Sequence, residues 1–300
     1  MRPTISICVV TFRRPAGLAR LLDSLARLKL PEGVAAEVVI VDNDPEGSAF
    51  RRPRRLQQAG LLPVRWRHGA RGDIAHARNL CVDDARGDWL ALIDDDEVAH
   101  EDWLRAYWQL AGRCEADGYF GPVIPRLEVE RQSWLDLPGF YTRRRWPTGS
   151  ELGLHGPCTA NAFLRRSLLL RHRFDPAFGR TLGEDTECFL RARDAGARLV
   201  WCDEAMVTEF IPPGRHRPSW LVHRALEGAS AWARIERRRS SHPRALQGLL
   251  AAGRLLLAFC GLLVSAPGGR RRLFRAWLRV CVQAGRLWGL LGLDVRRRGD

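Results

Sequence analysis

Short apolar runs alternate with segments of helical periodicity over the first 110 residues of the chain. The runs at 5–12, 37–41 and 89–93 are almost continuously apolar, as buried strands of a parallel sheet are. Between them, apolar residues recur at the spacing of one helix face, as in the leucines that follow Pro15. Four strand–helix alternations predict an α/β fold with a mostly parallel central sheet, right-handed crossovers and helices on both faces. The predicted strands cover 5–12, 37–41, 64–66 and 89–93, and the predicted helices cover 15–28, 47–58 and 73–84, with a fourth beginning near Glu101.

Polar residues follow three of these strands at the point where each strand ends. Thr11 and Arg13 close the first strand, Asp42 ends the second, and Asp94–Asp96 with Glu97 follow the central one. In open α/β sheets, ligands bind beyond the carboxyl ends of the strands. We therefore expect these side chains to meet at one edge of the sheet.

The four consecutive acids after Ile93 predict a cation site or a solvated turn. Carboxylates repel one another in a cleft of low dielectric constant, unless a hard cation such as Mg²⁺ or Mn²⁺ lies among them. The alternative is an acidic turn that precedes the next helix, where acids are favoured by the helix dipole. The chain has neither G-x-G-x-x-G nor G-x-x-x-x-G-K-[ST], which argues against a dinucleotide enzyme or a P-loop ATPase.

The chain contains five sequence blocks, at 5–13, 39–43, 77–79, 89–97 and 183–187. In their order and spacing, they resemble family 2 glycosyltransferases over about the first 210 residues. The resemblance implies the GT-A nucleotide-diphospho-sugar transferase fold, an α/β architecture, here with C-terminal amphipathic helices. Two further segments, 120–123 and 178–187, are similar to bacterial exopolysaccharide enzymes of the succinoglycan type.

The resemblance implies a divalent metal, Mg²⁺ or Mn²⁺, bound at the acidic D-x-D motif. Asp96 would contact the metal, and Asp94 would lie nearer the ribose of the donor. A bound cation can stabilise the negative charge that develops on a leaving nucleoside diphosphate. Asp95 would be the variable middle residue, or simply a solvated acid.

The resemblance also implies several contacts to the nucleotide. Asp42 would hydrogen-bond the base, a role favoured by its place at the carboxyl end of a strand, and the alternative is a turn ahead of Pro45. Thr11 and Arg13 match the loop that contacts the nucleotide. Arg78 could reach the diphosphate, or could hold the acid cluster through a structural salt bridge.

Glu184 and Asp185 stand where a helix is expected to begin, after Gly183. Acids are favoured at such a position whatever their function. By resemblance, Asp185 is the general base that accepts the proton of the acceptor hydroxyl, with inversion at the anomeric carbon, while Glu184 is the weaker candidate. A carboxylate suits this role, because it needs only to accept a proton within hydrogen-bond reach.

The segment that precedes this helix carries aromatic residues and a loop, 158–163, that resembles the one beside the donor sugar. Trp134, Tyr141 and Trp146 could stack on sugar rings or simply pack. His216 stands where some relatives place a metal or diphosphate ligand, or could be a solvated loop residue. The processive motif Q-x-x-R-W is not matched by the segment 142–146, which favours addition of a single sugar.

The net charge of +14 lies entirely in the last part of the chain. From Arg215 onward there are 18 arginines and four acids, whereas the 30 basic and 30 acidic residues before it balance. The segment 248–266 is borderline for a spanning helix, and arginines on both flanks argue against a crossing. Along Leu273–Leu293, four arginines share one helix face, which predicts a helix lying in the interface of an anionic bilayer, or one packed on the catalytic domain. These are Arg272, Arg275, Arg279 and Arg286.

The predicted organisation is a glycosyltransferase domain at 1–235 and a basic, membrane-associating helical tail at 236–300. Residues 1–110 would bind the nucleotide and 111–235 the acceptor. The expected partners are a nucleotide-sugar donor, a lipid-linked or oligosaccharide acceptor and an anionic membrane surface, with no nucleic acid. Cysteines without metal spacing and a start without signal-peptide features predict the cytoplasmic face of the inner membrane.

Two other functions fit parts of the sequence. A nucleotidyltransferase also uses an α/β fold and a metal, but it is expected to have a glycine-rich activating loop with a basic residue near the first strand. The segment 11–15 contains no such loop. A non-catalytic protein that binds lipid or nucleic acid would use the basic tail, with a steep dependence of binding on salt.

Overall fold

The computed structural model describes residues 4–49, 62–69, 72–129, 135, 141–154, 156–293 and 295. The chain forms two compact units. The sheet unit comprises Met1–Arg126, Thr142–Gly179 and Glu184–Phe210. The helical unit comprises Leu127–Tyr141, Arg180–Gly183 and Ile211–Asp300.

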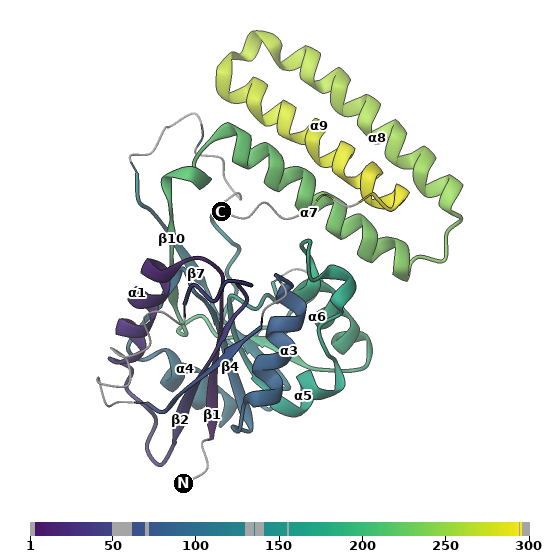
Figure 1. Cartoon of the computed structure of the whole chain (residues 1–300). Coiled ribbons are helices and arrows are strands. Elements are labelled where there is room, and N and C mark those ends of the chain that lie inside the picture. The colour runs from purple at the N-terminus through teal and green to yellow at the C-terminus, as the bar shows by residue number, and fades with distance from the viewer. Residues whose placement is uncertain are drawn as a thin grey trace. The chain divides into compact units, whose positions relative to one another are not determined.

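A seven-stranded sheet with the order β3-β2-β1-β4-β8-β6-β9 forms the centre of the sheet unit (Figure 1). Neighbouring strands are parallel except around β8, which runs antiparallel to both β4 and β6. The prediction of a mostly parallel α/β sheet is therefore confirmed. The strands are β1 (Ile5–Thr11), β2 (Ala36–Asp42), β3 (Val64–His68), β4 (Trp89–Asp94), β6 (Gly118–Phe120), β8 (Asn161–Arg165) and β9 (Leu199–Trp201).

Helices cover both faces of this sheet because its strands are apolar on both sides. Ile7 and Val9 of β1 pack in the same core as α1 and α4, whereas Cys8 packs in the core of α3, α5 and α6. Pro15 begins α1, as predicted, and Asp73 caps α3 by accepting a hydrogen bond from the backbone N–H of His76 at 2.9 Å. The helices are α1 (Pro15–Leu25), α3 (Ile74–Asp84), α4 (Trp103–Ala111), α5 (Arg166–Arg171) and α6 (Glu184–Asp194), with a 3₁₀ turn η1 (Pro176–Phe178) before α6.

A second, three-stranded sheet has the order β5-β10-β7. Its strands are β5 (Glu97–Ala99), β7 (Val123–Leu127) and β10 (Val207–Ile211). β5 begins directly after the acidic run, and β10 pairs with it antiparallel so that Glu209 lies opposite Glu97. This pairing brings a fifth acid to the end of β4.

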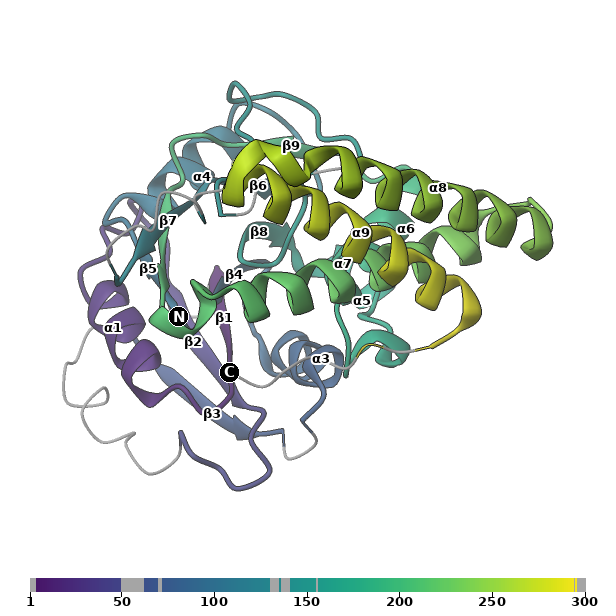
Figure 2. The same cartoon turned by 90° about the horizontal axis from the view of Figure 1, so that it is seen from above.

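Three long helices make up most of the helical unit, with α9 lying between α7 and α8 (Figures 1 and 2). Leu221 of α7 and Leu278 of α9 share a small apolar core. Gly285 and Gly289 of α9 touch the backbone of α7 so closely that a Cβ at either position would collide with a carbonyl oxygen. The helices are α7 (Pro218–Arg239), α8 (Arg244–Ser265) and α9 (Gly269–Leu291), with 3₁₀ turns η2 (Pro213–Arg215) and η3 (Ala266–Gly268).

The two C-terminal helices expose different surfaces. Leu278, Val280 and Cys281 of α9 are buried, so much of the apolar side that we expected to meet a membrane packs inside the unit instead. Arg272, Arg275 and Arg279 are exposed, while Arg286 pairs with Glu236 of α7 at 2.7 Å. The apolar surface that faces outward belongs mainly to α8.

Eight large apolar side chains of α8 are exposed, and Ala251 is its buried residue among those described. The helical stretch Ala245–Leu291 contains a window long and apolar enough to cross a membrane by length and composition, with a mean hydropathy of 2.1. The exposed apolar residues of α8 are Leu246, Leu249, Leu250, Leu256, Leu257, Phe259, Leu263 and Val264.

In the sheet unit, the other predicted strands and helices agree with the structure to within two residues, apart from the end of α1. α8 and α9 each begin four residues before the segments 248–266 and 273–293 that the sequence indicated. The helix expected at 47–58 lies mostly outside the described residues, as does Trp134.

Candidate active site

The turn after β1 is held by contacts to two acidic segments. Arg13 adopts a left-handed backbone conformation with φ of 55°, which is uncommon for a residue other than glycine. Its guanidinium is half exposed and pairs with the buried carboxylate of Asp44 at 3.1 Å. Thr11 is buried, and its hydroxyl donates a hydrogen bond to Asp95 at 2.8 Å. The strained turn is thus fixed from both sides.

Asp95 is not the solvated acid that was one expectation, because it is buried beneath this turn. In addition to the bond from Thr11, it accepts hydrogen bonds from the backbone N–H of Phe12 at 3.3 Å and from Arg14 at 3.1 Å. Burial raises the pKa of Asp95 to about 6, even though Arg14 opposes the shift. The middle acid of the run therefore anchors the β1–α1 turn.

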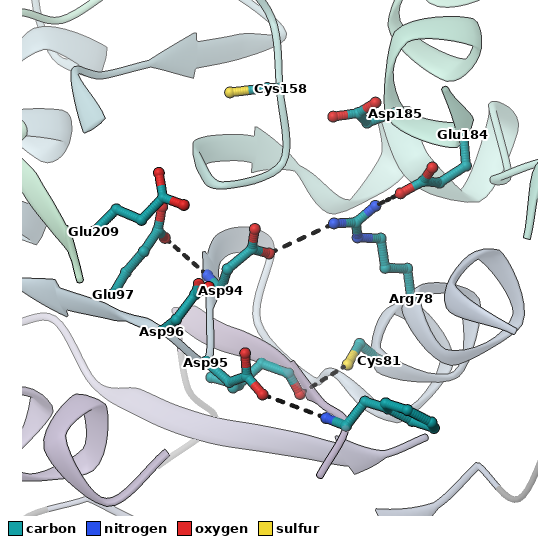
Figure 3. A network of polar contacts seen from close by, with 12 residues as sticks. Arg78, Cys81, Asp94, Asp95, Asp96, Glu97, Cys158, Glu184, Asp185 and Glu209 are labelled. Carbon is teal, nitrogen blue, oxygen red and sulfur yellow. Dashed lines mark hydrogen bonds and ion pairs between the residues drawn. The ribbon is translucent and has the colours of Figure 1, made fainter. Parts of the chain in front are cut away.

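Asp94 and Asp96 have side chains that reach solvent, at 43% and 12% exposure. Asp96 pairs with Arg14 at 2.9 Å, and the backbone N–H of Asp94 donates to Glu97 at 2.9 Å. Glu97 is buried, and burial together with the charges of Asp94, Asp96 and Glu209 raises its pKa well above the usual range. The end of β4 is therefore a concentrated negative region (Figure 3).

Arg78 joins the two acidic motifs that the sequence singled out. It extends from α3, is 7% exposed, and lies between Asp94, at 3.5 Å, and Glu184, with which it forms a buried ion pair (Figure 3). Of the two roles expected for Arg78, the salt bridge to the acid cluster is the one present here. Contact with a diphosphate stays a prediction.

Glu184 and Asp185 begin α6, and their side chains have different surroundings. Glu184 is buried against Arg78, whereas Asp185 is partly exposed and accepts a hydrogen bond from the backbone N–H of Thr186 at 2.7 Å. Asp185 lies near enough to Arg78 and Cys158 for its charge to raise the pKa of both (Figure 3). The sheet unit thus brings both Asp185 and the D-x-D motif close to one arginine.

Asp42 is fully buried at the end of β2. One carboxylate oxygen accepts from the backbone N–H of Asp44 at 3.0 Å, and the other accepts from that of Ala49 at 2.7 Å. These bonds form the turn that was the alternative for this residue. Its role in binding a base stays a prediction.

The remaining predicted residues have the following contacts. Trp146 packs edge-on against Trp201, with ring centroids 4.9 Å apart. In the helical unit, the Tyr141 hydroxyl lies 3.2 Å from Nδ1 of His216. His216 is 4% exposed, so the expectation of a solvated loop residue is wrong. Asn161, from the loop-like segment 158–163, is buried and lies in β8.

Three residues of this site were missed as functional candidates. Arg14, directly after the predicted first strand, contacts both Asp95 and Asp96. Arg143 contacts Cys158 at 2.9 Å and Glu209 at 3.8 Å. The sequence offered one usable signal for Glu209, an acid inside the otherwise uncharged segment 207–211.

The donor set at the end of β4 fits a hard divalent cation. Asp94 and Asp96 would supply the carboxylate oxygens that Mg²⁺ and Mn²⁺ prefer. Burial raises the pKa of Glu97, and so do the charges of Asp94, Asp96 and Glu209, which a cation would offset. Within the described part of the chain, no group of three His, Cys, Asp or Glu residues is placed to hold a metal ion. Phosphate oxygens and water would therefore complete the coordination.

Comparison of the fold with solved structures gives glycosyltransferases. A mannosyltransferase from Pyrobaculum calidifontis, solved with GDP-Man and Mn²⁺, superposes with a TM-score of 0.66 at 18% identity, over 97% of this chain and 88% of that one. S. aureus TarS residues 1–349, solved with UDP-GlcNAc, superposes with a TM-score of 0.57 at 16% identity, over 97% and 92%. At these identities the likeness establishes the GT-A fold alone.

Sequence comparison is more specific. The chain is 33% identical over 294 residues to the succinoglycan biosynthesis protein ExoM of Rhizobium meliloti (strain 1021), which covers 96% of this chain and 93% of ExoM. It is 27% identical to ExoO of the same organism over 66% of this chain and 58% of that protein. The family model for "Glycosyl transferase family 2" matches residues 6–172. The chain therefore belongs to glycosyl transferase family 2, and it is a glycosyltransferase with the GT-A fold.

Proposed function

We propose that this enzyme transfers one sugar from a nucleotide-sugar to a lipid-linked or oligosaccharide acceptor during synthesis of a cell-surface polysaccharide, with inversion at the anomeric carbon. The observation that carries the proposal is the position of Arg78 between Asp94 and the Glu184–Asp185 pair. Family membership supports the reaction class, and the similarity to ExoM supports the pathway.

Asp94 and Asp96 hold a divalent cation together with the donor diphosphate in this proposal. When bound, the cation stabilises the charge of the leaving nucleoside diphosphate. Arg14 orients Asp96, because the two pair at 2.9 Å, and Arg78 holds Asp94 in place. The mannosyltransferase solved with GDP-Man and Mn²⁺ supports the use of a divalent metal together with a nucleotide-sugar.

Asp185 takes the proton of the acceptor hydroxyl. Two observations favour it over Glu184. Glu184 is buried in an ion pair with Arg78, so its carboxylate is already engaged and shielded from an acceptor. Asp185 is partly exposed at the start of α6, where an acceptor can reach it. Direct displacement with a single base inverts the anomeric configuration.

Nucleotide contacts are assigned to the turns after β1 and β2. Asp42 lies at the right strand end for the base, and its bonds to the backbone of the following turn fix the shape of that turn. Arg13 keeps a half-exposed guanidinium for phosphate or ribose. Thr11 and Asp95 act from beneath by bonding to each other, so they support the nucleotide-binding loop without facing the nucleotide.

The reaction is tested by a screen of nucleotide-sugars with Mg²⁺ or Mn²⁺, in which release of nucleoside diphosphate is measured with and without saccharide acceptors. We expect acceptor-dependent release with one donor, loss of release in EDTA, and a product whose anomeric configuration by NMR is opposite to that of the donor. Retained configuration would refute the single-base mechanism. Absence of release with every donor and metal would refute the transferase proposal.

The helical unit is assigned to the membrane surface, at its cytoplasmic face. α8 exposes most of its large apolar residues, and arginine triplets lie close to both of its ends, at 237–239 and 270–272. An apolar helix with cationic flanks fits an anionic bilayer interface. Such a surface would keep the enzyme beside a lipid-linked acceptor.

The packing of α9 argues that α8 lies in the plane of the membrane. With 22 residues α8 is about 33 Å long, enough to cross a bilayer. However, α9 packs along α8, so a crossing would carry Arg275 and Arg279 to hydrocarbon depth. Each would cost about 3 kcal/mol there. An in-plane helix leaves these arginines among the headgroups.

Vesicle flotation tests this assignment with matched variants. Leu249, Leu256 and Leu263 are seven residues apart and share one face of α8. Their combined change to Ser should lower binding to anionic vesicles roughly 100-fold, at about 1 kcal/mol for each partly inserted leucine. Leu154→Ser, an exposed leucine of the sheet unit, is the control and should bind normally. Equal binding by the triple variant would refute the assignment.

A further inference from the structure

The segment 142–148 belongs to the sheet unit and is fixed there by contacts that follow Arg143 in the chain. Arg145 donates two hydrogen bonds to the carboxylate of Asp203, at 2.8 and 2.7 Å. The hydroxyl of Thr148 accepts a hydrogen bond from the backbone N–H of Asp203 at 2.9 Å. The backbone that carries Arg143 is therefore held in place within this one unit.

The guanidinium of Arg143 lies beside the acidic region at the end of β4. One of its nitrogens donates a hydrogen bond to the thiol sulfur of Cys158 at 2.9 Å, and another lies 3.8 Å from a carboxylate oxygen of Glu209. The side chain is 43% exposed. A guanidinium has five N–H groups, a thiol sulfur is a weak acceptor, and a separation of 3.8 Å is too long for a hydrogen bond. The contacts with described residues therefore leave most of this hydrogen-bonding capacity open to a ligand.

Cys158 indicates where Arg143 lies relative to the proposed reacting groups. Burial raises the pKa of the Cys158 thiol, Arg143 opposes the shift, and the charges of Asp185 and Asp94 add to it, so the thiol lies near both carboxylates (Figure 3). In the proposed function, the donor diphosphate is held at Asp94, and Asp185 deprotonates the acceptor that attacks the anomeric carbon. The donor sugar must then lie between these two carboxylates. It would meet Cys158 and the guanidinium that contacts this thiol.

A guanidinium and a carboxylate side by side suit the hydroxyl groups of a sugar. Each hydroxyl can both donate and accept, so Arg143 can donate to one hydroxyl while Glu209 accepts from its neighbour. A carboxylate on the same part of the sugar would be repelled by Glu209, and the negative charges of Glu97 and Asp94 also act on this position. The surroundings of Arg143 therefore favour a sugar with uncharged hydroxyl groups over a hexuronate.

We propose that Arg143 is a specificity-determining residue for the donor: beside Glu209, it hydrogen-bonds the hydroxyl groups of a neutral sugar on the nucleotide-sugar. The inference rests on the proposed function and adds the class of sugar that is transferred. The contacts that carry it all lie within the sheet unit. Because the segment 142–148 is anchored, the guanidinium needs little further ordering when the sugar binds.

Titration calorimetry with Mn²⁺ tests the assignment on a panel of UDP- and GDP-linked hexoses and hexuronates, each compared with UDP or GDP alone. Arg143→Leu should weaken binding of the preferred hexose donor about 10- to 100-fold, because a hydrogen bond from a charged donor is lost. Binding of the nucleoside diphosphate alone should change less than about twofold. Arg143→Lys keeps the charge without the planar fork and should recover only part of the affinity.

Arg144→Leu is the matched control, because it removes the same charge from the neighbouring residue. The guanidinium of Arg144 lies over the ring of Trp146, away from the contacts that carry the proposal, and this variant should bind the donor as wild type does.

Donor analogues that lack one hydroxyl provide a readout that general damage to the fold would not change. Wild type should bind the analogue without the hydroxyl that Arg143 contacts about tenfold more weakly than the parent donor, whereas Arg143→Leu should bind the two alike. Equal weakening of nucleotide-sugar and nucleoside diphosphate would assign Arg143 to the diphosphate and overturn the proposal. Unchanged binding by Arg143→Leu, or a preference of wild type for hexuronates, would overturn it as well.

These affinities also separate the inference from the proposed function. If wild type binds a nucleotide-sugar but transfers no sugar, the proposed function fails, while the comparison of donor and diphosphate still decides the role of Arg143. If wild type binds no nucleotide-sugar in the panel, both are refuted.

Discussion

The acidic run at the end of β4 and the acidic pair at the start of α6 share one arrangement, in which one acid is buried and its neighbour reaches solvent. At β4 the buried acid is Asp95, held by Thr11 and Arg14. At α6 it is Glu184, held by Arg78. Asp96 and Asp185 are the accessible neighbours. In each pair, the buried carboxylate makes structural contacts, whereas its neighbour stays accessible.

The two regions differ in the charge that surrounds the accessible carboxylates. Asp94 and Asp96 lie beside the buried Glu97, whose pKa is raised by burial and by the charges of Asp94, Asp96 and Glu209. Asp185 instead lies near the guanidinium of Arg78 and accepts a hydrogen bond from the backbone N–H of Thr186. In the proposed function, the same residue type would therefore serve as a cation ligand at β4 and as a base at α6, according to its neighbours.

The largest expected effect is on the accessible acid of α6. Asp185→Asn should lower kcat about 1,000-fold, because the amide cannot accept the proton, and should leave donor binding unchanged. Transfer assays and calorimetry with the donor measure the two quantities. Glu187→Gln, an acid on the same helix that pairs with Arg191, is the control and should keep activity. Full transfer by Asp185→Asn would remove it as the base.

The buried acid of α6 should affect stability instead. Glu184→Gln leaves the buried Arg78 with a weakened partner, and we expect the free energy of unfolding to fall by about 3 kcal/mol. Urea unfolding measures it. Replacing both residues by leucine should recover part of the loss, because no uncompensated charge remains. If Glu184→Gln were as stable as wild type, the structural role that separates Glu184 from Asp185 would be contradicted.

Asp95, the buried acid directly after β4, should make the free energy of unfolding depend on pH. Its folded pKa of about 6 lies above the value near 3.9 of an unfolded chain, so the folded state binds the proton more tightly. Its contribution to stability is present below pH 4 and is lost as pH rises to about 6, by roughly 2 to 3 kcal/mol. The free energy of unfolding of wild type minus that of Asp95→Asn, measured with EDTA from pH 4 to 7, should fall accordingly. A difference that is constant across this range would contradict the burial of this charge.

The smallest expected effect concerns one carboxylate of the cation site. Asp96→Asn should weaken Mn²⁺-dependent binding of a nucleoside diphosphate about tenfold, because Asp94 and the phosphates still hold the ion. Titration calorimetry with and without Mn²⁺ measures this change. Asp102→Asn, an exposed acid at the start of α4, should bind as wild type does. Equal metal dependence in Asp96→Asn would place the ion elsewhere.

Much of the sheet unit could be predicted because its strands are continuous apolar runs between helical segments. Strands β1, β2 and β4 and the polar residues at their ends follow from this pattern. β8 did not, because its five residues have no periodic signal and resembled a loop. Its antiparallel pairing with β4 depends on contacts between distant segments.

The contacts of individual acids could not be predicted. Three consecutive aspartates are equivalent in sequence, and it is the pairing of β1 with β4 that brings Thr11 to Asp95. Glu209 reaches the site because β10 pairs with β5, again through distant residues. The apolar side of α9 looked available to a membrane, since its periodicity does not reveal that α7 covers it.

Gly285 and Gly289 determine how this protein can be shortened. Their contact with α7 lets the two helices pack backbone to backbone, so α7 without α9 would expose Leu221 and the carbonyl groups that now face these glycines. Truncation after residue 240 should therefore yield an aggregating protein. We expect a soluble version of the protein when α8 alone is removed and a flexible linker joins α7 to α9.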